Sequence, residues 1–356
     1  MIENFKQSIK YMDFLQSEQR YSEAEELCKK NIELLSSSEE GEVIQISLQN
    51  RLVSILEAQS RYNEALVVIQ SAQSNLSEIK ASIAPNIALS LEITTLSNLG
   101  NLQRIQGNYA EAEQTYKQAI ELIENQATEE YQSKKNQLAN SLAIVYKYWG
   151  KFDAAESLYQ KTLAILIEQY GSDNGEVAVI YHNLAGLNHA RGDYQTAEIW
   201  AGKSYQLHVE LFGVQDAKTI ADGAAFGSIL HGLNKWDEAI SYFKEAITFF
   251  EDKFGSMHYD VALNLNNLAA SEEAKGNLSA AEEAYRKALE IKIQILGESH
   301  SELAITLNNL ASVLKQMGKK EEAKVFLERA KTIFETTLGK EHPNTQICRD
   351  NINSIS

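Results

Sequence analysis

Histidines are the residues whose spacing first suggests chemistry in this chain. The sequence carries seven of them, and His182 and His189 are seven positions apart, which places them two turns along one face of a helix. His231 follows His189 by 42 residues. Imidazoles that share a face can bind a metal ion, but no carboxylate or cysteine with ligand spacing joins these three. We therefore expect no metal site, and interpret them either as part of a binding surface or as ordinary packing residues.

Sequence motifs of the common enzyme classes are missing. The chain contains no HExxH, GxSxG, GxGxxG or P-loop motif. Its many carboxylates follow the pattern of solvated helix faces, as at Glu111, Glu282 and Glu283. The sequence therefore predicts no catalytic residue and no cofactor, and we expect a protein that is not an enzyme.

The composition of the chain indicates which classes of partner it can bind and in which cell compartment it is expected. The formal net charge is -16, from 33 Lys+Arg against 49 Asp+Glu, which repels phosphate backbones and argues against nucleic acid. The apolar runs are too short to span a membrane. Cys28 and Cys348 have no paired spacing, so two free thiols in a reducing compartment are expected. With no basic and apolar leader at the start of the sequence, we expect a cytoplasmic protein.

A short pattern recurs along the chain: usually an aromatic residue, two further residues and an alanine, as in Tyr109-Ala110-Glu111-Ala112. The spacings between successive alanines are 41, 47 and 43 residues, and then 42 four times. The anchor alanines of the eight repeats are Ala24, Ala65, Ala112, Ala155, Ala197, Ala239, Ala281 and Ala323. Glycine or asparagine precedes most anchors by five residues, and a second glycine separates most repeats, so each period predicts two helices.

The repeat predicts an all-α solenoid of about eight helix-turn-helix repeats, because one hairpin cannot bury its apolar face alone. We expect one solenoid over residues 1–340 and a C-terminal capping helix over residues 341–356. The 47-residue step predicts a long loop over residues 77–90, which includes Pro85. A second loop is expected over residues 36–41, and the turns at Gln19 and Ser60 are expected to be less ideal than those made by glycine.

The repeat resembles the tetratricopeptide (TPR) family, and its period near 42 resembles the kinesin-light-chain subtype. The resemblance is carried by Leu296-Gly297-Glu298-Ser299-His300, by Leu307-Asn308-Asn309-Leu310-Ala311 and by Gly318. It implies a right-handed superhelix whose first helices line a concave groove that holds a peptide or protein segment. The function implied is an adaptor or scaffold. A ligand-responsive regulatory sensor and a non-catalytic, substrate-recruiting subunit of an enzyme complex remain alternatives.

Two adjacent positions, fifteen and fourteen residues before each anchor, and a third position eight residues before it supply the candidate partner-binding residues on the first helices. Repeated asparagine inside a helix needs a reason, because asparagine is a poor helix former. Its amide either grips the main chain of a guest or ties neighbouring repeats together. The position eight residues before each anchor is basic in the middle of the chain, which favours a partner with acidic groups or a free C-terminus. The candidates are Asn98, Arg104, Asn140, Lys147, His182, His189, His231, Asn266, Asn308 and Lys315.

Two local patterns leave specific questions for the structure. His258, His300 and His342 stand three residues after a glycine, where earlier repeats carry Asn174 and Asp216, so we expect hydrogen bonds at helix starts. The sixth repeat replaces the usual Asn-Asn-Leu-Ala run with residues 222–227, Asp-Gly-Ala-Ala-Phe-Gly. Close helix packing and a ligand pocket are both possible reasons. The sequence does not specify the partner's identity or the oligomeric state.

Overall fold

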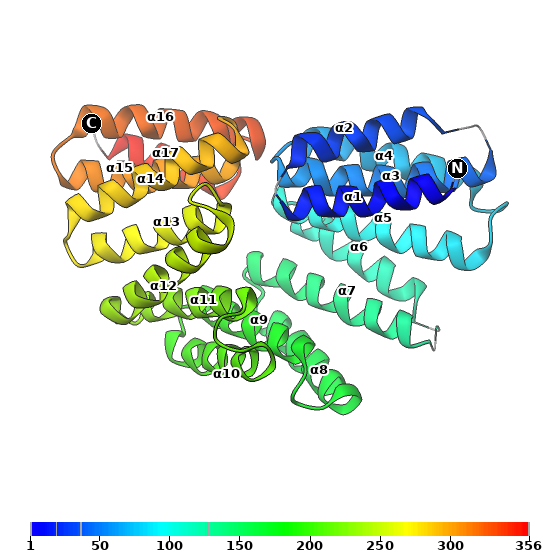
Figure 1. Ribbon diagram of the computed structural model, residues 1–356, viewed down its shortest axis with the longest axis horizontal. Helices are drawn as coiled ribbons and strands as arrows, with labels where there is room; N and C mark the ends of the chain where they lie inside the picture. Colours follow the sequence, from blue (N-terminus) through cyan, green and yellow to red (C-terminus); the bar gives the residue numbers. More distant parts are fainter. Residues whose placement is uncertain (1, 19, 36–37, 125, 127, 355–356) are drawn as a thin grey trace. The chain divides into compact units, whose positions relative to one another are not determined.

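The computed structural model describes residues 2–18, 20–35, 38–124, 126 and 128–354, and each regular element among them is an α-helix (Figure 1). The chain divides into two compact units, Met1–Val145 and Tyr146–Ser356. The division falls inside α7 (Glu129–Tyr148).

The helices of the first unit before α7 are α1 (Ile2–Ser17), α2 (Tyr21–Glu33), α3 (Glu39–Ala58), α4 (Tyr62–Ile79), α5 (Pro85–Ile105) and α6 (Tyr109–Leu122). The helices of the second unit after α7 are α8 (Phe152–Tyr170), α9 (Gly175–Arg191), α10 (Tyr194–Phe212), α11 (Ala217–Gly232), α12 (Trp236–Phe254), α13 (Tyr259–Ala274), α14 (Leu278–Leu296), α15 (Ser301–Gln316), α16 (Lys320–Thr337) and α17 (Pro343–Asn353).

Helices α1 to α6 and α8 to α17 each pack on the next helix along the chain, so that helical hairpins stack within each unit (Figure 1). The anchor alanines explain why. All eight lie in the first turn of a second helix and all are fully buried. A methyl side chain at that place lets the two helices of a hairpin approach closely. The predicted all-α repeat of helical hairpins is therefore confirmed, while the right-handed sense of the whole superhelix stays a prediction.

The turns inside the hairpins use the left-handed backbone region. Ser60 and Asn234 adopt positive φ values of 55° and 60°, which non-glycine residues seldom do. Ser60 lies within 2.9 Å of the Tyr62 hydroxyl, so its own hydroxyl is engaged in the turn it forms. The first expected turn position, Gln19, lies outside the described residues.

Both predicted loops are shorter than expected. Helix α4 continues to Ile79 and α5 begins at Pro85, so only residues 80–84 connect them. Proline suits the first position of a helix because its fixed φ is helical and its missing N–H would be unsatisfied there. The second loop prediction is wrong at Glu39, where α3 starts, with the Ser38 hydroxyl accepting from the Gly41 N–H at 3.1 Å. Residues 36 and 37 lie outside the described residues.

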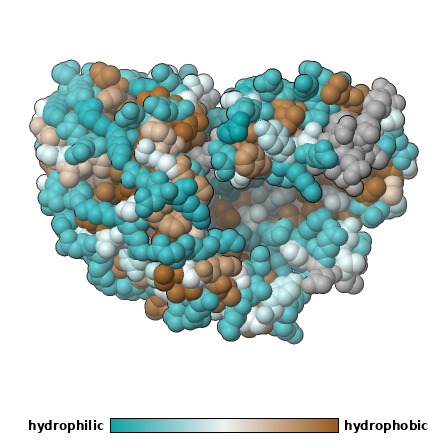
Figure 2. Space-filling view, in the orientation of Figure 1, coloured by the Kyte–Doolittle hydropathy of each residue, from teal (hydrophilic) through white to brown (hydrophobic). Residues whose placement is uncertain are grey.

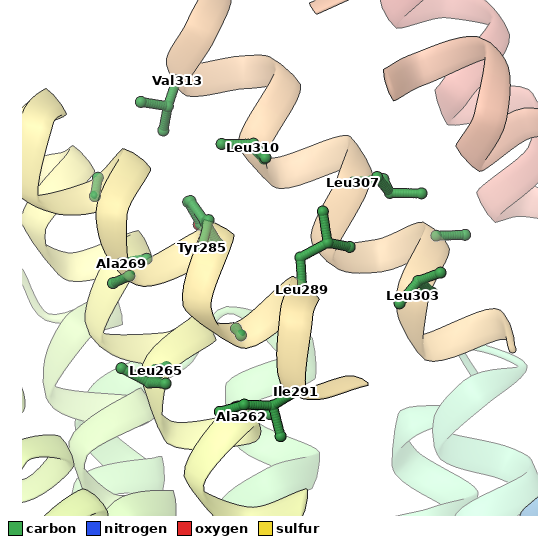
Figure 3. Close-up of a cluster of buried hydrophobic side chains, with 14 of the residues drawn as sticks. Ala262, Leu265, Ala269, Tyr285, Leu289, Ile291, Leu303, Leu307, Leu310 and Val313 are labelled. Atoms are coloured by element: carbon green, nitrogen blue, oxygen red, sulfur yellow. The ribbon is translucent and has the colours of Figure 1, made fainter. Parts of the chain in front are cut away.

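The largest described core cluster runs through the second unit from α11 to α17. Figure 3 shows how α13, α14 and α15 meet there. Their labelled side chains include Leu265 and Ala269 from α13, Tyr285 and Leu289 from α14, and Leu307 and Leu310 from α15. The helix predicted after His342 is present as α17, and its Cys348 is fully buried in this cluster. In the first unit a smaller cluster joins α3, α4 and α5 around Ile46 and Leu76.

The face shown in Figure 2 is mainly hydrophilic, with apolar residues scattered over it, as is usual for the exposed surface of a folded domain. In the described part of the chain, none of the helices combines the length and the apolar character that crossing a bilayer requires.

Candidate functional site

Three of the histidines begin helices. The Nδ1 atoms of His258, His300 and His342 accept hydrogen bonds from backbone N–H groups two residues later, at 3.3, 3.1 and 3.2 Å. Asn174 and Asp216 make the same bond with a side-chain oxygen, each at 2.8 Å. The predicted hydrogen bonds at helix starts are confirmed, and they account for these three histidines without a ligand.

The asparagine series joins neighbouring first helices. In the first unit, Asn98 donates to the Asn50 side-chain oxygen at 3.0 Å, and Asn50 donates to the Thr95 hydroxyl at 2.9 Å. In the second unit, Thr306 donates to the Asn266 oxygen at 3.2 Å, and Asn351 donates to the Asn308 oxygen at 2.8 Å.

These contacts support the view that the amides tie repeats together. An amide offers two donor hydrogens and two acceptor lone pairs, so the half-buried Asn266 and Asn308, engaged here through their oxygens, can also donate to a guest. Asn50 is buried and donates to both Ile46 and Thr95, so its amide only ties repeats together. Asn140, on α7, is half-buried.

A groove of about 610 Å³ in the second unit brings three of the predicted residues together: His231 from α11, and Asn308 and Lys315 from α15. We call it the C-terminal groove. Its further lining is Ala270, Glu273, Ala274, Tyr285, Asn309, Ala311, Ser312, Gln316, Leu327, Asn351 and Ser354.

The C-terminal groove is polar and its charges are mixed. Glu273 accepts from the Ser312 hydroxyl at 2.8 Å and the Gln316 amide at 2.5 Å, and burial raises the pKa of its carboxyl. The His231 Nδ1 lies 3.0 Å from the Ser271 hydroxyl, and burial lowers the pKa of that imidazole. Lys315 is exposed and donates to the Ser354 hydroxyl at 3.0 Å. The groove therefore offers hydrogen-bonding groups throughout and a cation at Lys315.

A second, smaller cavity holds the other two predicted histidines of this unit. It measures about 190 Å³ and lies among α9, α10 and α11. We call it the α9–α11 pocket. Its lining is His182, Ala185, Gly186, His189, Ala201, Ser204, Asp222, Ala225, Ser228 and Ile229. Small side chains form much of its wall, which is why three packed helices leave a space there.

A buried hydrogen-bond network forms one side of this pocket. The Asp222 carboxylate accepts from Nδ1 of His182 at 2.9 Å and from Nδ1 of His208 at 2.8 Å, and the Ser204 hydroxyl also reaches it. Burial acts to raise the pKa of Asp222, but hydrogen bonds from His182 and Ser204 and the charges of the two imidazoles hold it below its usual range. Among the described residues, no group of three His, Cys, Asp or Glu side chains is arranged to hold a metal ion.

His189 carries less positive charge than its position in the basic series suggested. Burial lowers the pKa of this imidazole, and the nearby charges of His231 and Lys147 lower it further. The ring packs edge-on against Tyr194, with centroids 5.3 Å apart. At neutral pH the positive charge in this part of the series is therefore carried by Lys147. The Lys147 Nζ lies 3.7 Å from the place that a Cβ on Gly186 would occupy.

In the first unit, Arg104 is turned toward neighbours of its own helix and the preceding repeat. Its guanidinium donates to the Asn101 oxygen at 2.7 Å, while the Asn101 amide donates to Glu57 at 3.0 Å. Burial raises the pKa of Glu57 to about 7, against smaller lowering effects of Asn101 and Arg104. The predicted site residues are thus distributed over the two units, and the structure groups only those from nearby repeats.

Asp222 and His208 were not predicted as partners from the sequence. Comparing the residues that lie at the same distance from the anchor alanine in each repeat would have shown that both are unusual. The repeats that flank Asp222 carry Ile180 and Asn264 at its position, and those that flank His208 carry Leu166 and Phe250.

Close packing explains the two glycines of the sixth repeat. A Cβ on Gly223 would stand 3.2 Å from the Tyr205 ring, and one on Gly227 would stand 3.1 Å from the Phe243 ring. Both distances are tight for a real side chain, so these positions favour glycine. The same run also supplies Asp222 and Ala225 to the α9–α11 pocket, so the packing and the cavity both occur.

Comparison with known proteins identifies the repeat. A family model described as "Tetratricopeptide repeat" matches residues 134–208, 176–252, 219–294 and 260–336, which together cover more than half of the chain. A second tetratricopeptide model matches residues 93–126. Among curated proteins, the chain is 25% identical over 152 residues to a "Clustered mitochondria protein homolog" from Aspergillus oryzae. That match covers 42% of this chain and 12% of the relative, so the chain spans only a small part of such proteins.

Solved structures resemble the fold. The Rap protein complexed with competence and sporulation factor has a TM-score of 0.59 at 15% identity, and the match covers 99% of this chain and 98% of that one. BtubC (BKLC) from P. vanneervenii has a TM-score of 0.53 at 23% identity, covering 66% of this chain and 94% of that one. The "Podosopora anserina putative kinesin light chain nearly identical TPR-like repeats" match at 19% identity with a TM-score of 0.46, over 56% of this chain and 95% of that one.

Proposed function

Since the chain belongs to the tetratricopeptide repeat family, we propose that it is a non-catalytic protein-protein interaction adaptor whose C-terminal groove binds an extended peptide or protein segment. The observation that carries this proposal is the convergence of His231, Asn308 and Lys315 on one groove of about 610 Å³. Cavities of roughly 300–1,000 Å³ are usual for ligand sites, so a few residues of a guest chain fit.

The lining of the groove favours a guest in extended conformation. Asn309 and Asn351 line it with donors and acceptors, and the Ser312 hydroxyl and Gln316 amide stand beside them. A main chain in extended form exposes N–H and C=O groups that such side chains can satisfy. The Rap structure named above contains a bound factor, which supports ligand binding by a similar fold.

The cation at Lys315 favours a carboxylate on the guest, either an acidic side chain or a free C-terminus. Because His189 and His231 are largely neutral at pH 7, we place this preference at Lys315 rather than along the whole series.

We further place the protein in the cytoplasm, since Cys28 and Cys348 are both free thiols. Fractionation of the source cell checks that placement.

The groove is tested by affinity purification with mass spectrometry, using wild type, Asn309→Lys and Lys315→Glu. Lys320→Glu is the matched control, because Lys320 is exposed on α16 and outside the groove lining. We expect the recovered partner segment to bind at least about tenfold more weakly to each groove variant and normally to the control. Equal affinity for all four proteins contradicts binding in this groove.

The α9–α11 pocket favours a second candidate function, a regulatory sensor in which a small ligand changes the shape of the repeat array. A ligand-dependent change in radius of gyration, measured by small-angle scattering, supports that function. A recruiting subunit of an enzyme complex would use the C-terminal groove in the same way as an adaptor does.

A further inference from the structure

We propose that the α9–α11 pocket binds the ammonium end of a short alkyl chain, either a lysine side chain of a bound protein or a free alkylamine. The proposal rests on the residues of α9, α10 and α11 and is independent of peptide binding in the C-terminal groove.

The pocket exists because one repeat lacks a side chain that its neighbours have. Fourteen residues before the anchor alanine, the other repeats of the second unit carry Asn183, Asn267 and Asn309, whereas this repeat carries Ala225. Ala225 lines the pocket, as does Gly186 on the facing helix α9. The space that an asparagine side chain fills elsewhere is therefore open here.

The same junction carries a buried histidine and carboxylate. His208 stands where the flanking repeats have Leu166 and Phe250, and Asp222 stands where they have Ile180 and the uncharged Asn264. Burying polar groups costs free energy unless they are hydrogen-bonded, and a buried charge costs more. This junction therefore differs from its neighbours in charge, next to an open cavity.

The hydrogen bonds of the network leave acceptors facing the pocket. An ionised carboxylate only accepts, so His182 and His208 both present Nδ1–H to Asp222. With Nδ1–H directed at Asp222, the Nε2 atom of His182 is an acceptor when the ring is uncharged, and this side chain is 47% exposed and lines the pocket. A ligand that meets these groups must donate hydrogen bonds.

The two serines that line the pocket also act as hydrogen-bond acceptors toward a ligand. Ser228 donates to the Ala224 carbonyl at 3.3 Å, and the Ser204 hydroxyl donates within the network, to Asp222 or to the Ala178 carbonyl at 3.0 Å. Since each hydroxyl hydrogen is already donated, a ligand that reaches either serine finds only acceptor lone pairs. A buried negative charge among acceptors selects a cationic donor over a neutral one or an anion.

The volume and the apolar lining of the cavity indicate the size and the chemistry of the part of the ligand that carries the ammonium group. A volume of about 190 Å³ is below the range of drug-sized sites, roughly 300–1,000 Å³, and fits one side chain. Ala185, Ala201 and Ile229 give apolar contact for methylene groups. Lys147 lies beside Gly186 at one edge, and its charge opposes a cationic ligand without filling the cavity.

The test is an NMR titration of the full-length, isotope-labelled chain at pH 8 with n-butylamine, n-butanol and butyrate. We expect butylammonium to give saturable shifts at the amides of Ala185, Gly186 and Ala225, with butanol at least tenfold weaker and butyrate without effect. Butyrate binding as tightly as butylamine, or three equal affinities, overturns the proposal.

Substitutions distinguish the contribution of the cavity to butylamine binding from the contribution of the nearby charges. Ala225→Asn restores the residue that the neighbouring repeats carry, so the fold is retained and butylamine binding is lost. Asp222→Asn removes the preference for butylamine over butanol. Lys147→Gln tightens butylamine binding by severalfold, and Lys161→Gln, on α8 and outside the pocket lining, is its control. Unchanged butylamine binding in Ala225→Asn, or weaker binding in Lys147→Gln, contradicts the site.

Two probes identify the source of the ammonium group. N-acetyl-lysine N-methylamide represents a lysine side chain of a protein, and 1,5-diaminopentane represents a free amine. Binding of either one supports the proposal, the tighter binder of the two names the source, and binding of neither overturns it.

Discussion

The imidazole of His342 caps α17 by accepting a hydrogen bond at Nδ1, which only the unprotonated ring can do. Burial lowers the pKa of His342 below its ordinary value near 6.5. As the pH falls, this imidazole is therefore protonated in the unfolded chain before it is protonated in the folded one. The stabilisation is therefore present above pH 6.5 and is lost as the pH falls through the folded-state pKa. We expect weaker hydrogen-exchange protection of α17 at pH 5 than at pH 8, after correction for intrinsic exchange rates.

Substitutions at this cap give a direct check. His342→Asn supplies the oxygen that Asn174 uses in an earlier repeat, so protection of α17 is expected to remain and to lose this pH dependence. His342→Ala is expected to cost about 1 kcal/mol at pH 8, the usual value for a lost N-cap. A pH dependence unchanged in His342→Asn would contradict the assignment.

Glu57 is expected to change the stability of the fold with pH in the opposite direction to His342. Burial raises the pKa of Glu57 to about 7, so the folded state holds the proton more tightly than the unfolded chain does. Glu57 therefore contributes at most about 3 kcal/mol to the free energy of unfolding. This contribution is fully present below pH 4.5 and is lost as the pH rises through about 7.

Glu57→Gln should therefore raise the unfolding midpoint in urea at pH 8 and change it little at pH 4.5. Glu64→Gln is the matched control, because the hydrogen bond from Arg61 outweighs desolvation and lowers the pKa of Glu64. That variant is expected to lose stability at pH 8. Destabilisation by both substitutions at pH 8 would refute the account of Glu57.

Residue roles were predictable from the sequence where one repeat position alternates among chemically equivalent side chains. His300 and Asn174 share such a position, and the cap followed from it. The contact between His208 and Asp222 was not predictable in this way, because these residues lie on different helices and only the stacking of α10 on α11 brings them together. Comparing equivalent positions flags the unusual residues but does not show that they meet.

At the scale of elements, α17 closes one side of the C-terminal groove. Asn351 donates to Asn308, Lys315 donates to Ser354, and Cys348 is buried against the preceding hairpin. Deleting residues 341–356 exposes that apolar face and removes two lining residues. We expect faster hydrogen exchange in α15 and α16 and little change in α9 to α11, measured by mass spectrometry. Uniform exchange changes across the second unit would show that α17 is not a local cap.

Helix number followed from the sequence, but helix ends did not. Two turn signals per period fixed two helices per repeat, since a left-handed turn residue stops a helix. The extra residues of the 47-residue step could lengthen a loop or a helix equally well. They lengthen helices: α5 has 21 residues and starts at Pro85.

At the scale of the whole molecule, the repeat period determines which residues can share a site. Equivalent positions lie on successive first helices, so a series read along the sequence places its members in a row. In the C-terminal groove, His231 of the sixth repeat meets Asn308 and Lys315 of the eighth, so residues two repeats apart can still share a site. The number of repeats was predictable from the anchor alanines, whereas the α9–α11 pocket depended on the side-chain volumes of three packed helices.

The division into two compact units predicts that damage to one core stays local. Ile46 is fully buried in the cluster of α3 to α5, and Leu307 is fully buried in the cluster of α11 to α17. Replacing either with alanine leaves a cavity and costs about 2–5 kcal/mol. Since repeat arrays transmit stability through neighbouring repeats, Ile46→Ala should increase hydrogen exchange in α3, α4 and α5 and leave α13 to α16 protected. Leu307→Ala should give the reverse pattern, and equal loss of protection throughout the chain in both variants would mean that the two units unfold as one.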